Sequence, residues 1–303
     1  MNRIQVELME SNFQITGTGE VLWDVFPDRK RFGGAPANFA CHAQALGTNT
    51  HMVSCVGRDQ LGLQILSFLE TRQINTSSIA FSDRHPTGTV QVQLNPSGHP
   101  KFKICGDSAW DFIPWSKELA LLASTPNAVC YGTLSQRSQM SRDTIQRFLE
   151  SLPPDCLRVF DINFRQQFYD LTLVRQSLQF ADVLKLSDEE LPVLASALGL
   201  SGSNMTIVKA LMKQYDLRLI ALTQGEKGAI LVSSDQVSEC QGIRVEVVDT
   251  VSAGDAFTAA MTIGLLGGHD LEAINYYACR VAACVCSQAG AAPDLPNELR
   301  III

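Results

Sequence analysis

The sequence predicts an α/β protein in which helices are layered on a β-sheet. Short runs rich in Val, Ile and Leu alternate with amphipathic stretches along the chain, as in layered α/β folds. With 303 residues, of which 46% are hydrophobic, the chain can bury a large core. Strands are predicted over residues 13–18, 51–56, 128–131, 157–161, 183–186, 218–223 and 229–233.

Helices are predicted between these strands. Pro36 suits the first turn of a helix over residues 35–46, and Gly47 is a natural stop after it. Apolar residues recur at helical spacing over 61–69 and over 207–215, so each stretch has one face that can be buried. The second of these helices can be capped by Ser201, Ser203 or Asn204.

One region departs from this alternation and predicts a β-hairpin. Residues 87–104 alternate apolar and polar side chains, turn, and resume as a second strand, which leaves one face in water. Another β-like piece lies at 21–26. We expect a single α/β domain over residues 1–303, in which a small β lid interleaves with the core and is formed by about 20–34 and 86–112.

Composition and charge exclude several classes of function. Against 31 Asp+Glu there are 24 Lys+Arg, which gives a net charge of −7, so we expect no nucleic-acid partner. Residues 1–14 lack the pattern of a secretory signal, and the longest nearly apolar run, 256–266, is too short to span a bilayer. We therefore expect a soluble, cytoplasmic protein that binds small molecules and no membrane.

The cysteines and histidines predict no zinc site. The nine cysteines are scattered, and none forms a Cys-x-x-Cys pair, so reduced thiols are expected. Cys279, Cys284 and Cys286 lie close together in a helical stretch, but their spacing does not place three thiolates on one side of a helix. The five histidines show no familiar metal-binding spacing.

The segment Val-Asp-Thr-Val-Ser-Ala-Gly-Asp (248–255) is the most informative in the chain. It follows a β-like run at 243–248 and opens a helix predicted over 253–266, and its small residues let a phosphate approach the free N–H groups there. A carboxylate beside an anion repels it, so Asp255 makes sense as a general base that takes a proton from an attacking hydroxyl. The alternative from spacing alone is that Asp255 only complements the helix dipole.

Two further segments place polar groups where a ligand could lie. Gly33 and Gly34 precede a helix start and allow close approach to the backbone, and Asn38 offers a donor and an acceptor to hydroxyl groups. Asp24 interrupts an apolar strand, as carboxylates that bind ligand hydroxyls do. A plain loop-to-helix junction and a turn or capping role are the alternatives. Leu22 stands where a dinucleotide-binding motif needs its third glycine, so a Rossmann site is excluded.

Six segments, taken together, carry a family resemblance that covers nearly the whole chain. They are Gly-Gly-Ala-Pro-Ala-Asn (33–38), Asp-Ile-Asn-Phe-Arg (161–165), Leu-Lys-Leu-Ser-Asp-Glu-Glu (184–190), Thr-Gln-Gly-Glu-Lys-Gly (223–228), Asp-Thr-Val-Ser-Ala-Gly-Asp (249–255) and Gln-Ala-Gly-Ala-Ala-Pro (288–293). In this order and at these separations they resemble the signatures of the ribokinase/fructokinase (PfkB) family of carbohydrate kinases.

The resemblance implies a ribokinase-like fold, a three-layer α/β/α sandwich with a mostly parallel central sheet and a small β lid over the sugar. It also implies a phosphotransferase that moves the γ-phosphate of ATP to a sugar hydroxyl, with Mg²⁺ bridging the phosphates. Carried over by position, Asp255 resembles the catalytic base. The backbone N–H groups of Ser252, Ala253, Gly254 and Asp255 resemble the family's anion hole.

The remaining family positions are also matched. Those that bind the sugar correspond to Asp24, Gly33, Gly34, Asn38 and Arg165. Those that meet the nucleotide, its phosphates and magnesium correspond to Lys185, Ser187, Glu190, Thr223, Gly225 and Gly228. Loops whose carbonyls hold a monovalent cation such as K⁺ correspond to Asp249, Val251 and residues 290–293.

The chain departs from the family pattern at two positions. Ser252 replaces the first glycine of Gly-Ala-Gly-Asp, and Ser187 replaces the asparagine of Asn-x-x-Glu. Ser252 keeps its backbone N–H but tolerates an unusual φ less well than glycine, and Ser187 reaches less far than asparagine. Neither change removes the base, so we expect an active kinase.

Within the family, the Ala-Pro before Asn38 and the Asp-x-Asn-x-Arg segment at 161–165 resemble fructokinases most. The alternatives are a kinase for 2-keto-3-deoxygluconate, ribose or a nucleoside, and a non-catalytic sensor of sugar or nucleotide. The resemblance also implies a homodimer, because lids of this family pair between subunits and the hairpin at 87–104 exposes its edges.

Overall fold

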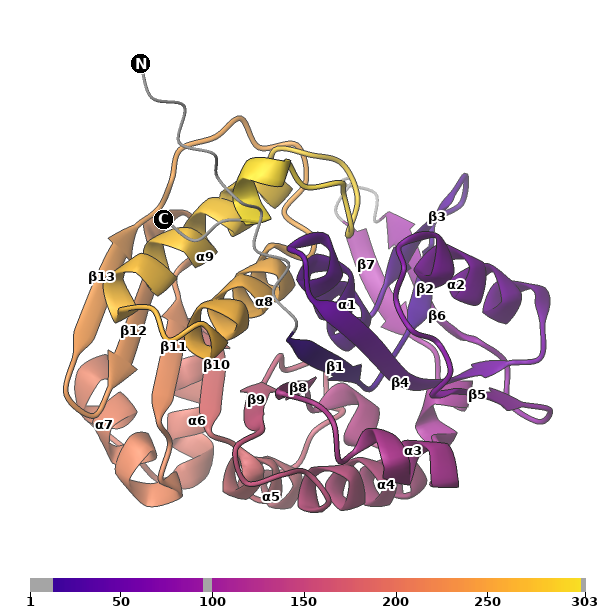
Figure 1. Ribbon diagram of the computed structural model, residues 1–303, viewed down its shortest axis with the longest axis horizontal. Helices are drawn as coiled ribbons and strands as arrows, with labels where there is room; N and C mark the ends of the chain where they lie inside the picture. The colour runs from indigo at the N-terminus through magenta and orange to yellow at the C-terminus, as the bar shows by residue number, and fades with distance from the viewer. Residues whose placement is uncertain (1–12, 95–99, 301–303) are drawn as a thin grey trace.

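A nine-stranded sheet forms the centre of the computed structural model, which describes residues 13–94 and 100–300 (Figure 1). Its strands are β1 (Gln14–Thr18), β4 (Asn49–Gly57), β5 (Ile79–Ser82), β8 (Ala128–Tyr131), β9 (Leu157–Asp161), β10 (Val183–Ser187), β11 (Leu219–Thr223), β12 (Gly228–Ser233) and β13 (Val237–Gln241). Their order is β13-β12-β11-β10-β9-β8-β1-β4-β5. Neighbours are parallel from β11 to β5, whereas β12 and β13 add an antiparallel edge.

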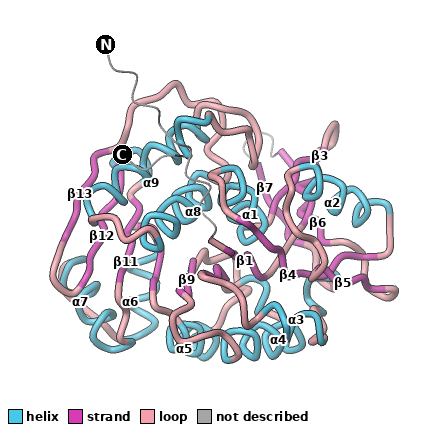
Figure 2. Tube along the Cα trace, viewed as in Figure 1, coloured by secondary structure: helices cyan, strands magenta, loops and turns pink. Residues whose placement is uncertain are grey.

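Helices cover both faces of this sheet, which confirms the predicted three-layer sandwich (Figures 1 and 2). On one face lie α1 (Ala35–Ala45), α8 (Ala253–Leu266) and α9 (Leu271–Cys286). On the other lie α3 (Lys117–Leu122), α4 (Gln139–Glu150), α5 (Leu171–Phe180), α6 (Glu190–Leu198) and α7 (Asn204–Tyr215). Strands such as β8 are buried throughout because both faces are covered. No helix in the described part of the chain is long and apolar enough to cross a bilayer.

A smaller sheet is built from two segments that are far apart in the sequence. Its strands are β2 (Leu22–Val25), β3 (Lys30–Gly33), β6 (Gly88–Leu94) and β7 (Pro100–Ile104), in the order β3-β2-β6-β7. Parallel pairing of β2 with β6 joins the two predicted lid segments. The sheet packs on α2 (Gln60–Thr71), where the rings of Phe32 and Phe68 stack at 4.2 Å and Trp23 donates a hydrogen bond to the Leu61 carbonyl.

Most predicted elements are confirmed, but the β-like run at 243–248 is not a strand. The segment is a loop, and its apolar side chains Val245, Val247 and Val248 are exposed. An apolar run forms a strand only where it pairs with a neighbour, and this segment does not pair with β13, the last strand of the sheet. The N–H of Val248 instead donates to the carbonyl of Cys286 at the end of α9.

Candidate active site

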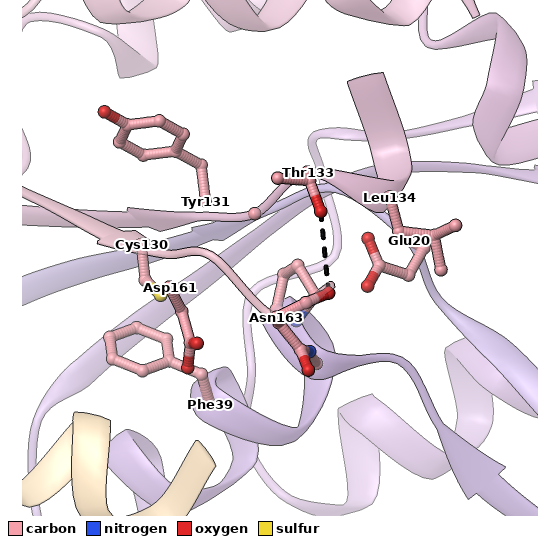
Figure 3. Close-up of a pocket in the computed structure, with 11 residues that line it drawn as sticks. Glu20, Phe39, Cys130, Tyr131, Thr133, Leu134, Asp161 and Asn163 are labelled. Carbon is pink, nitrogen blue, oxygen red and sulfur yellow. Dashed lines mark hydrogen bonds between the residues drawn. The ribbon is translucent and has the colours of Figure 1, made fainter. Parts of the chain in front are cut away.

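A pocket lies at the carboxyl ends of β1, β8 and β9, where the strand order reverses. Open α/β sheets bind ligands at such points because the connections leave the two strands in opposite directions. Figure 3 shows the carboxylates of Glu20 and Asp161 on opposite sides of this pocket, with Asn163 between them. Its lining residues are Glu20, Ala35, Pro36, Phe39, Cys130, Tyr131, Gly132, Thr133, Leu134, Asp161 and Asn163.

Asp255 lies in the first turn of α8, close to this pocket. Its Oδ2 accepts a hydrogen bond of 2.9 Å from Nδ2 of Asn38, which lies on α1. Removal from water raises the pKa of Asp255 to about 6, and the nearby charge of Asp161 acts in the same direction. The carboxylate can therefore take up and release a proton near neutral pH, as a general base must.

Asn38 is held in one orientation by this contact. An ionised carboxylate only accepts hydrogen bonds, so the NH₂ group of Asn38 faces Asp255 and the amide oxygen points away from it. The side chain is only 5% exposed, and its Oδ1 atom is buried without a hydrogen-bond partner. A buried amide oxygen in this state is an acceptor that awaits a donor.

Glu20 follows β1 and presents a second acceptor of this kind. The side chain is 3% exposed, and its Oε2 atom is buried without a hydrogen-bond partner. Burial raises the pKa of Glu20 to about 7, although a hydrogen bond from the Ala35 N–H and the charge of Arg165 oppose the shift. Sequence reasoning missed this residue, yet a polar side chain directly after a predicted strand was a usable signal.

Asp24 lies on β2 of the small sheet, half-buried. Burial raises its pKa to about 6, and the positive charges of Arg165 and Arg31 oppose the shift. A Cβ at Gly33 would lie 3.0 Å from Oδ2 of Asp24, and one at Gly34 would lie 2.4 Å from the carbonyl oxygen of Glu20. Gly34 thus lets the backbone pack closely against Glu20 and Val21, and Gly33 lies against the Asp24 side chain. Their predicted close approach to a ligand stays a prediction.

Lys185 projects from β10 toward the turn that precedes α8. Its Nζ donates to Oδ1 of Asp161 at 3.1 Å, and both side chains are buried. A Cβ at Gly254 would lie 3.1 Å from this Nζ, so the ammonium group lies directly beside the predicted anion hole. Burial alone would lower the pKa of Lys185, but the carboxylates of Asp161 and Glu190 raise it, so the side chain stays charged.

The predicted phosphate and magnesium segment forms a closed hydrogen-bond arrangement. Both carboxylate oxygens of Glu190 accept backbone N–H bonds of 2.8 Å, one from Phe164 and one from Ser187. The Ser187 hydroxyl accepts the N–H of Glu190 in return. Serine in place of asparagine therefore still bonds the first residue of α6, and each oxygen of Glu190 keeps one lone-pair direction for water or a hydrated cation.

Ser252 is the N-cap of α8 and has a left-handed backbone, with φ 69°. The helix has no side-chain hydrogen bond at this cap, and the Ala253 N–H donates to the Thr250 carbonyl at 3.4 Å. Of the predicted anion hole, the N–H groups of Gly254 and Asp255 at the start of α8 are therefore the ones placed to bind an anion. The Ser252 hydroxyl lies 2.7 Å from Nε2 of His42 on α1. His42 was not among the predicted site residues, although it lies one helical turn after Asn38.

The predicted monovalent-cation loops lie side by side. Oδ2 of Asp249 forms an ion pair of 2.6 Å with the guanidinium of Arg31 on β3. The same atom accepts a hydrogen bond of 3.2 Å from the N–H of Gly290. The Asp249 N–H also donates to the carbonyl of Cys286. Val251 is exposed. The Asp249 side chain thereby joins the two loops, and the monovalent-cation site stays a prediction.

The predicted nucleotide loop joins β11 to β12 and is shaped by its backbone. Gly225 and Gly228 both have positive φ, 57° and 104°. A Cβ at Gly228 would lie 2.0 Å from the carbonyl oxygen of Cys240, whereas one at Gly225 would meet no atom within 4 Å. The Thr223 hydroxyl donates to the carbonyl of Leu186. The structure does not bring this loop into the pocket that Glu20 and Asp161 line.

In the described residues, no cluster of three or more His, Cys, Asp and Glu side chains is arranged to hold a metal ion.

Arg165 is exposed, and its charge opposes the rise in the pKa values of Glu20, Asp24 and Asp255. It therefore lies near the carboxylates of the pocket, as its predicted sugar-binding position requires.

Comparison with known proteins gives this arrangement a family. The profile described as pfkB family carbohydrate kinase matches residues 1–298. The chain belongs to this family. As a PfkB carbohydrate kinase it is a phosphotransferase that acts on a sugar hydroxyl, and the predicted resemblance is confirmed.

Relatives of this PfkB kinase differ in the acceptor that their names state. Fructokinase of Salmonella typhimurium is 29% identical over 266 residues, which cover 84% of this chain and 85% of that protein. ATP-dependent 6-phosphofructokinase of Thermoanaerobacterium thermosaccharolyticum is 26% identical over 307 residues, covering 95% and 92%. The structure of an uncharacterized sugar kinase of Pyrococcus horikoshii in complex with ATP superposes with a TM-score of 0.79 at 28% identity, covering 92% of this chain and 94% of that one.

Proposed function

We propose that this PfkB kinase transfers the γ-phosphate of ATP to a neutral sugar of the fructose type, with Asp255 as the general base. The observation that carries the proposal is a pair of buried acceptor atoms near Asp255, Oε2 of Glu20 and Oδ1 of Asn38, neither of which has a hydrogen-bond partner. Sugar hydroxyls are donors that can satisfy both atoms at once.

The chemistry divides between the carboxylate of Asp255 and the start of α8. Asp255 takes the proton of the attacking hydroxyl, and its pKa of about 6 leaves it mostly ionised at neutral pH. The N–H groups of Gly254 and Asp255 and the ammonium of Lys185 stabilise negative charge on the transferred phosphate. Phosphoryl transfer needs mainly this positioning and charge neutralisation.

ATP is the proposed donor because the sugar kinase of Pyrococcus horikoshii carries it on a similar fold. Mg²⁺ would bridge the phosphates and neutralise their charge when bound, and its preference for oxygen and water ligands fits the free lone-pair directions of Glu190. K⁺ would be held by carbonyls of residues 249–251 and 290–293, two loops that the bond from the Gly290 N–H to Asp249 joins, and would support the turn before α8.

A neutral acceptor is favoured by the charge around the pocket. Glu20, Asp161 and Asp255 are acidic, and of the cations near them Lys185 is already paired with Asp161. Arg165 is exposed and is one positive charge against three acids. A carboxylate or phosphate on the acceptor would meet these side chains at close range and be repelled. This argues for fructose or ribose and against 2-keto-3-deoxygluconate or a sugar phosphate.

We infer that the small sheet acts as a lid on a single domain that spans the chain. Asp24 on β2 would reach the sugar only when this sheet lies over the pocket, and closure would exclude water that competes for the phosphate. A homodimer in which two lids pair would cover the open edges of β3 and β7. Light scattering of the purified protein measures this assembly directly.

The test is ADP release from Mg-ATP with fructose, ribose, tagatose, 2-keto-3-deoxygluconate, fructose 6-phosphate and adenosine, each with and without K⁺. We expect turnover with a neutral sugar that Asp255→Asn lowers by about 10²–10⁴-fold, while affinity for ATP changes little. An unchanged rate in Asp255→Asn rejects the base. A preference for an anionic acceptor rejects the neutral-sugar assignment.

The second candidate is a sensor that binds sugar or nucleotide without turnover. It is disfavoured because the base, the helix start and Lys185 are all in place. Binding of both ligands without ADP release in any of these assays would favour it.

A further inference from the structure

A buried hydrogen bond joins the turn before α8 to helix α1. Nε2 of His42 lies 2.7 Å from Oγ of Ser252, and the two residues are 1% and 9% exposed. His42 lies one helical turn after Asn38, whose side chain donates to Asp255. Two side chains of α1 therefore hold the start of α8, one at its N-cap and one at its carboxylate.

Ser252 needs such a partner because of its backbone. Its φ of 69° and ψ of 4° lie in the left-handed region, which is unfavourable for a residue with a Cβ and easy for glycine. The usual family signature has glycine at this position. The conformation cannot be relaxed without turning the first N–H groups of α8 away from the pocket.

The chemistry of His42 suits this role. Burial lowers its pKa to about 4, so the ring is neutral at physiological pH and can accept one hydrogen bond and donate another. The ring is also hydrogen-bonded to the backbone of Ala291. That loop contacts the turn a second time through the bond from the Gly290 N–H to Asp249. One side chain thus joins α1, the turn before α8 and the loop at 290–293.

We propose that His42 is a positioning residue for phosphoryl transfer, which holds Ser252 in the left-handed conformation that presents the N–H groups of Gly254 and Asp255 to the phosphate. This inference rests on the proposed kinase function. It applies to a chain with serine at position 252, because glycine adopts the same conformation without a partner.

The experiment is a double-mutant cycle with His42→Leu, Ser252→Gly and the combined variant. With Ser252 present, His42→Leu is expected to lower kcat about 10-fold or more and to change the KM of the acceptor less than about 3-fold. In the Ser252→Gly background, the same change is expected to cost less than about 3-fold in kcat. His42→Gln keeps a polar atom near Nε2 and should restore most of the loss.

The matched control is His51→Leu. His51 is a half-buried histidine on β4, far from the turn before α8, and its ring contacts the side chain of Gln14. It should leave kcat unchanged. Equal losses for His42→Leu in both backgrounds, or no loss in either, would overturn the proposal. Should His42→Leu fail to fold, His42→Asn replaces it in the same cycle and is read by the same criterion.

A second readout separates this role from the kinase function itself. The affinity of all four proteins for a non-hydrolysable ATP analogue is measured by calorimetry. If the wild type binds the analogue but phosphorylates no acceptor, the proposed function fails and the cycle is read from analogue affinity. If the wild type is active and the cycle shows no coupling in either readout, only the role of His42 fails.

Discussion

The acceptor half and the donor half of the site are built in different ways. Near the acceptor pocket, Glu20 and Asn38 are buried side chains whose free oxygen atoms point to a missing ligand. On the predicted donor side, the loop at 223–228 is shaped by glycines with positive φ, and the neighbouring segment exposes its apolar side chains, with Val247 62% exposed. In the proposed site, side chains would therefore recognise the acceptor, whereas backbone shape and a loop would meet the donor.

This difference has an energetic meaning. A buried carboxyl group costs free energy unless it is paired, and the raised pKa values of Glu20, Asp24 and Asp255 express that cost. A loop on the donor side carries no such cost. The acceptor half is therefore the part of the molecule where stability is given up for recognition.

The largest expected effect comes from removing the charge of Lys185, the buried cation beside the start of α8. Lys185→Met leaves Asp161 as a buried charge without its partner, so the free energy of unfolding should fall by about 3–5 kcal/mol. Urea denaturation measures this change. Lys213→Met, at an exposed position on α7, is the control and should shift it by less than about 0.5 kcal/mol. A similar small loss in Lys185→Met would show that the ion pair does not stabilise the site.

A second test of the difference between the two halves replaces Glu20, an acid of the acceptor half with a raised pKa. The pKa of Glu20 is about 7 in the folded protein and 4.5 ordinarily, so the folded state holds more protons between these values and stability falls as pH rises from about 4.5 to about 7. Glu20→Gln removes this loss. It should stabilise the protein by on the order of 3 kcal/mol at pH 8 and change little at pH 4.

The same Glu20→Gln variant should raise the KM of the sugar by about 10-fold, because the charged acceptor is lost. Melting curves at both pH values and steady-state kinetics test the two effects. Glu150→Gln, at the exposed end of α4, is the control. If the effect of Glu20→Gln on stability does not depend on pH, like that of the control, the pKa of Glu20 is not raised in the folded protein.

The donor half is sharpened by a pair of glycine replacements. Gly228→Ala places a Cβ against the carbonyl of Cys240 at a strained φ and should cost about 3 kcal/mol in unfolding free energy. Gly225→Ala meets open space and should cost about 1 kcal/mol, from its positive φ alone. The difference of about 2 kcal/mol, measured by denaturation, reports the packing of β12 on β13. Equal costs would mean that the loop adjusts freely.

Hydrophobic periodicity and the positions of small and turn residues predicted most of the fold. The predicted bounds of β8, β9 and α8 agree with the structure, because each is bordered by turn or glycine signals and buried on the side that its pattern indicates. The β-like prediction for 243–248 was wrong because an alternating apolar pattern does not show whether the segment pairs with a neighbouring strand. The short edge strands β3, β5 and β13 were missed because edges carry weak patterns.

The site was predicted through the motifs and only in part. Asp255, Asn38 and Lys185 were found at the positions that bring them together. His42 and Ser252 are 210 positions apart, so no local pattern joins them, and the free oxygen of Glu20 follows from packing alone. Contacts between distant segments are set by how α1 crosses α8, which single-sequence periodicity does not encode.

Three of the acids with raised pKa values also make the site a store of protons at neutral pH. Glu20 at about 7, with Asp24 and Asp255 at about 6, hold a fractional number of protons between them when no ligand is bound. Hydrogen bonds from sugar hydroxyls would favour the ionised forms, so each sugar that enters would expel protons into the buffer. Its heat of binding would then depend on the ionisation enthalpy of the buffer, which makes the pocket visible to calorimetry before any phosphate is transferred.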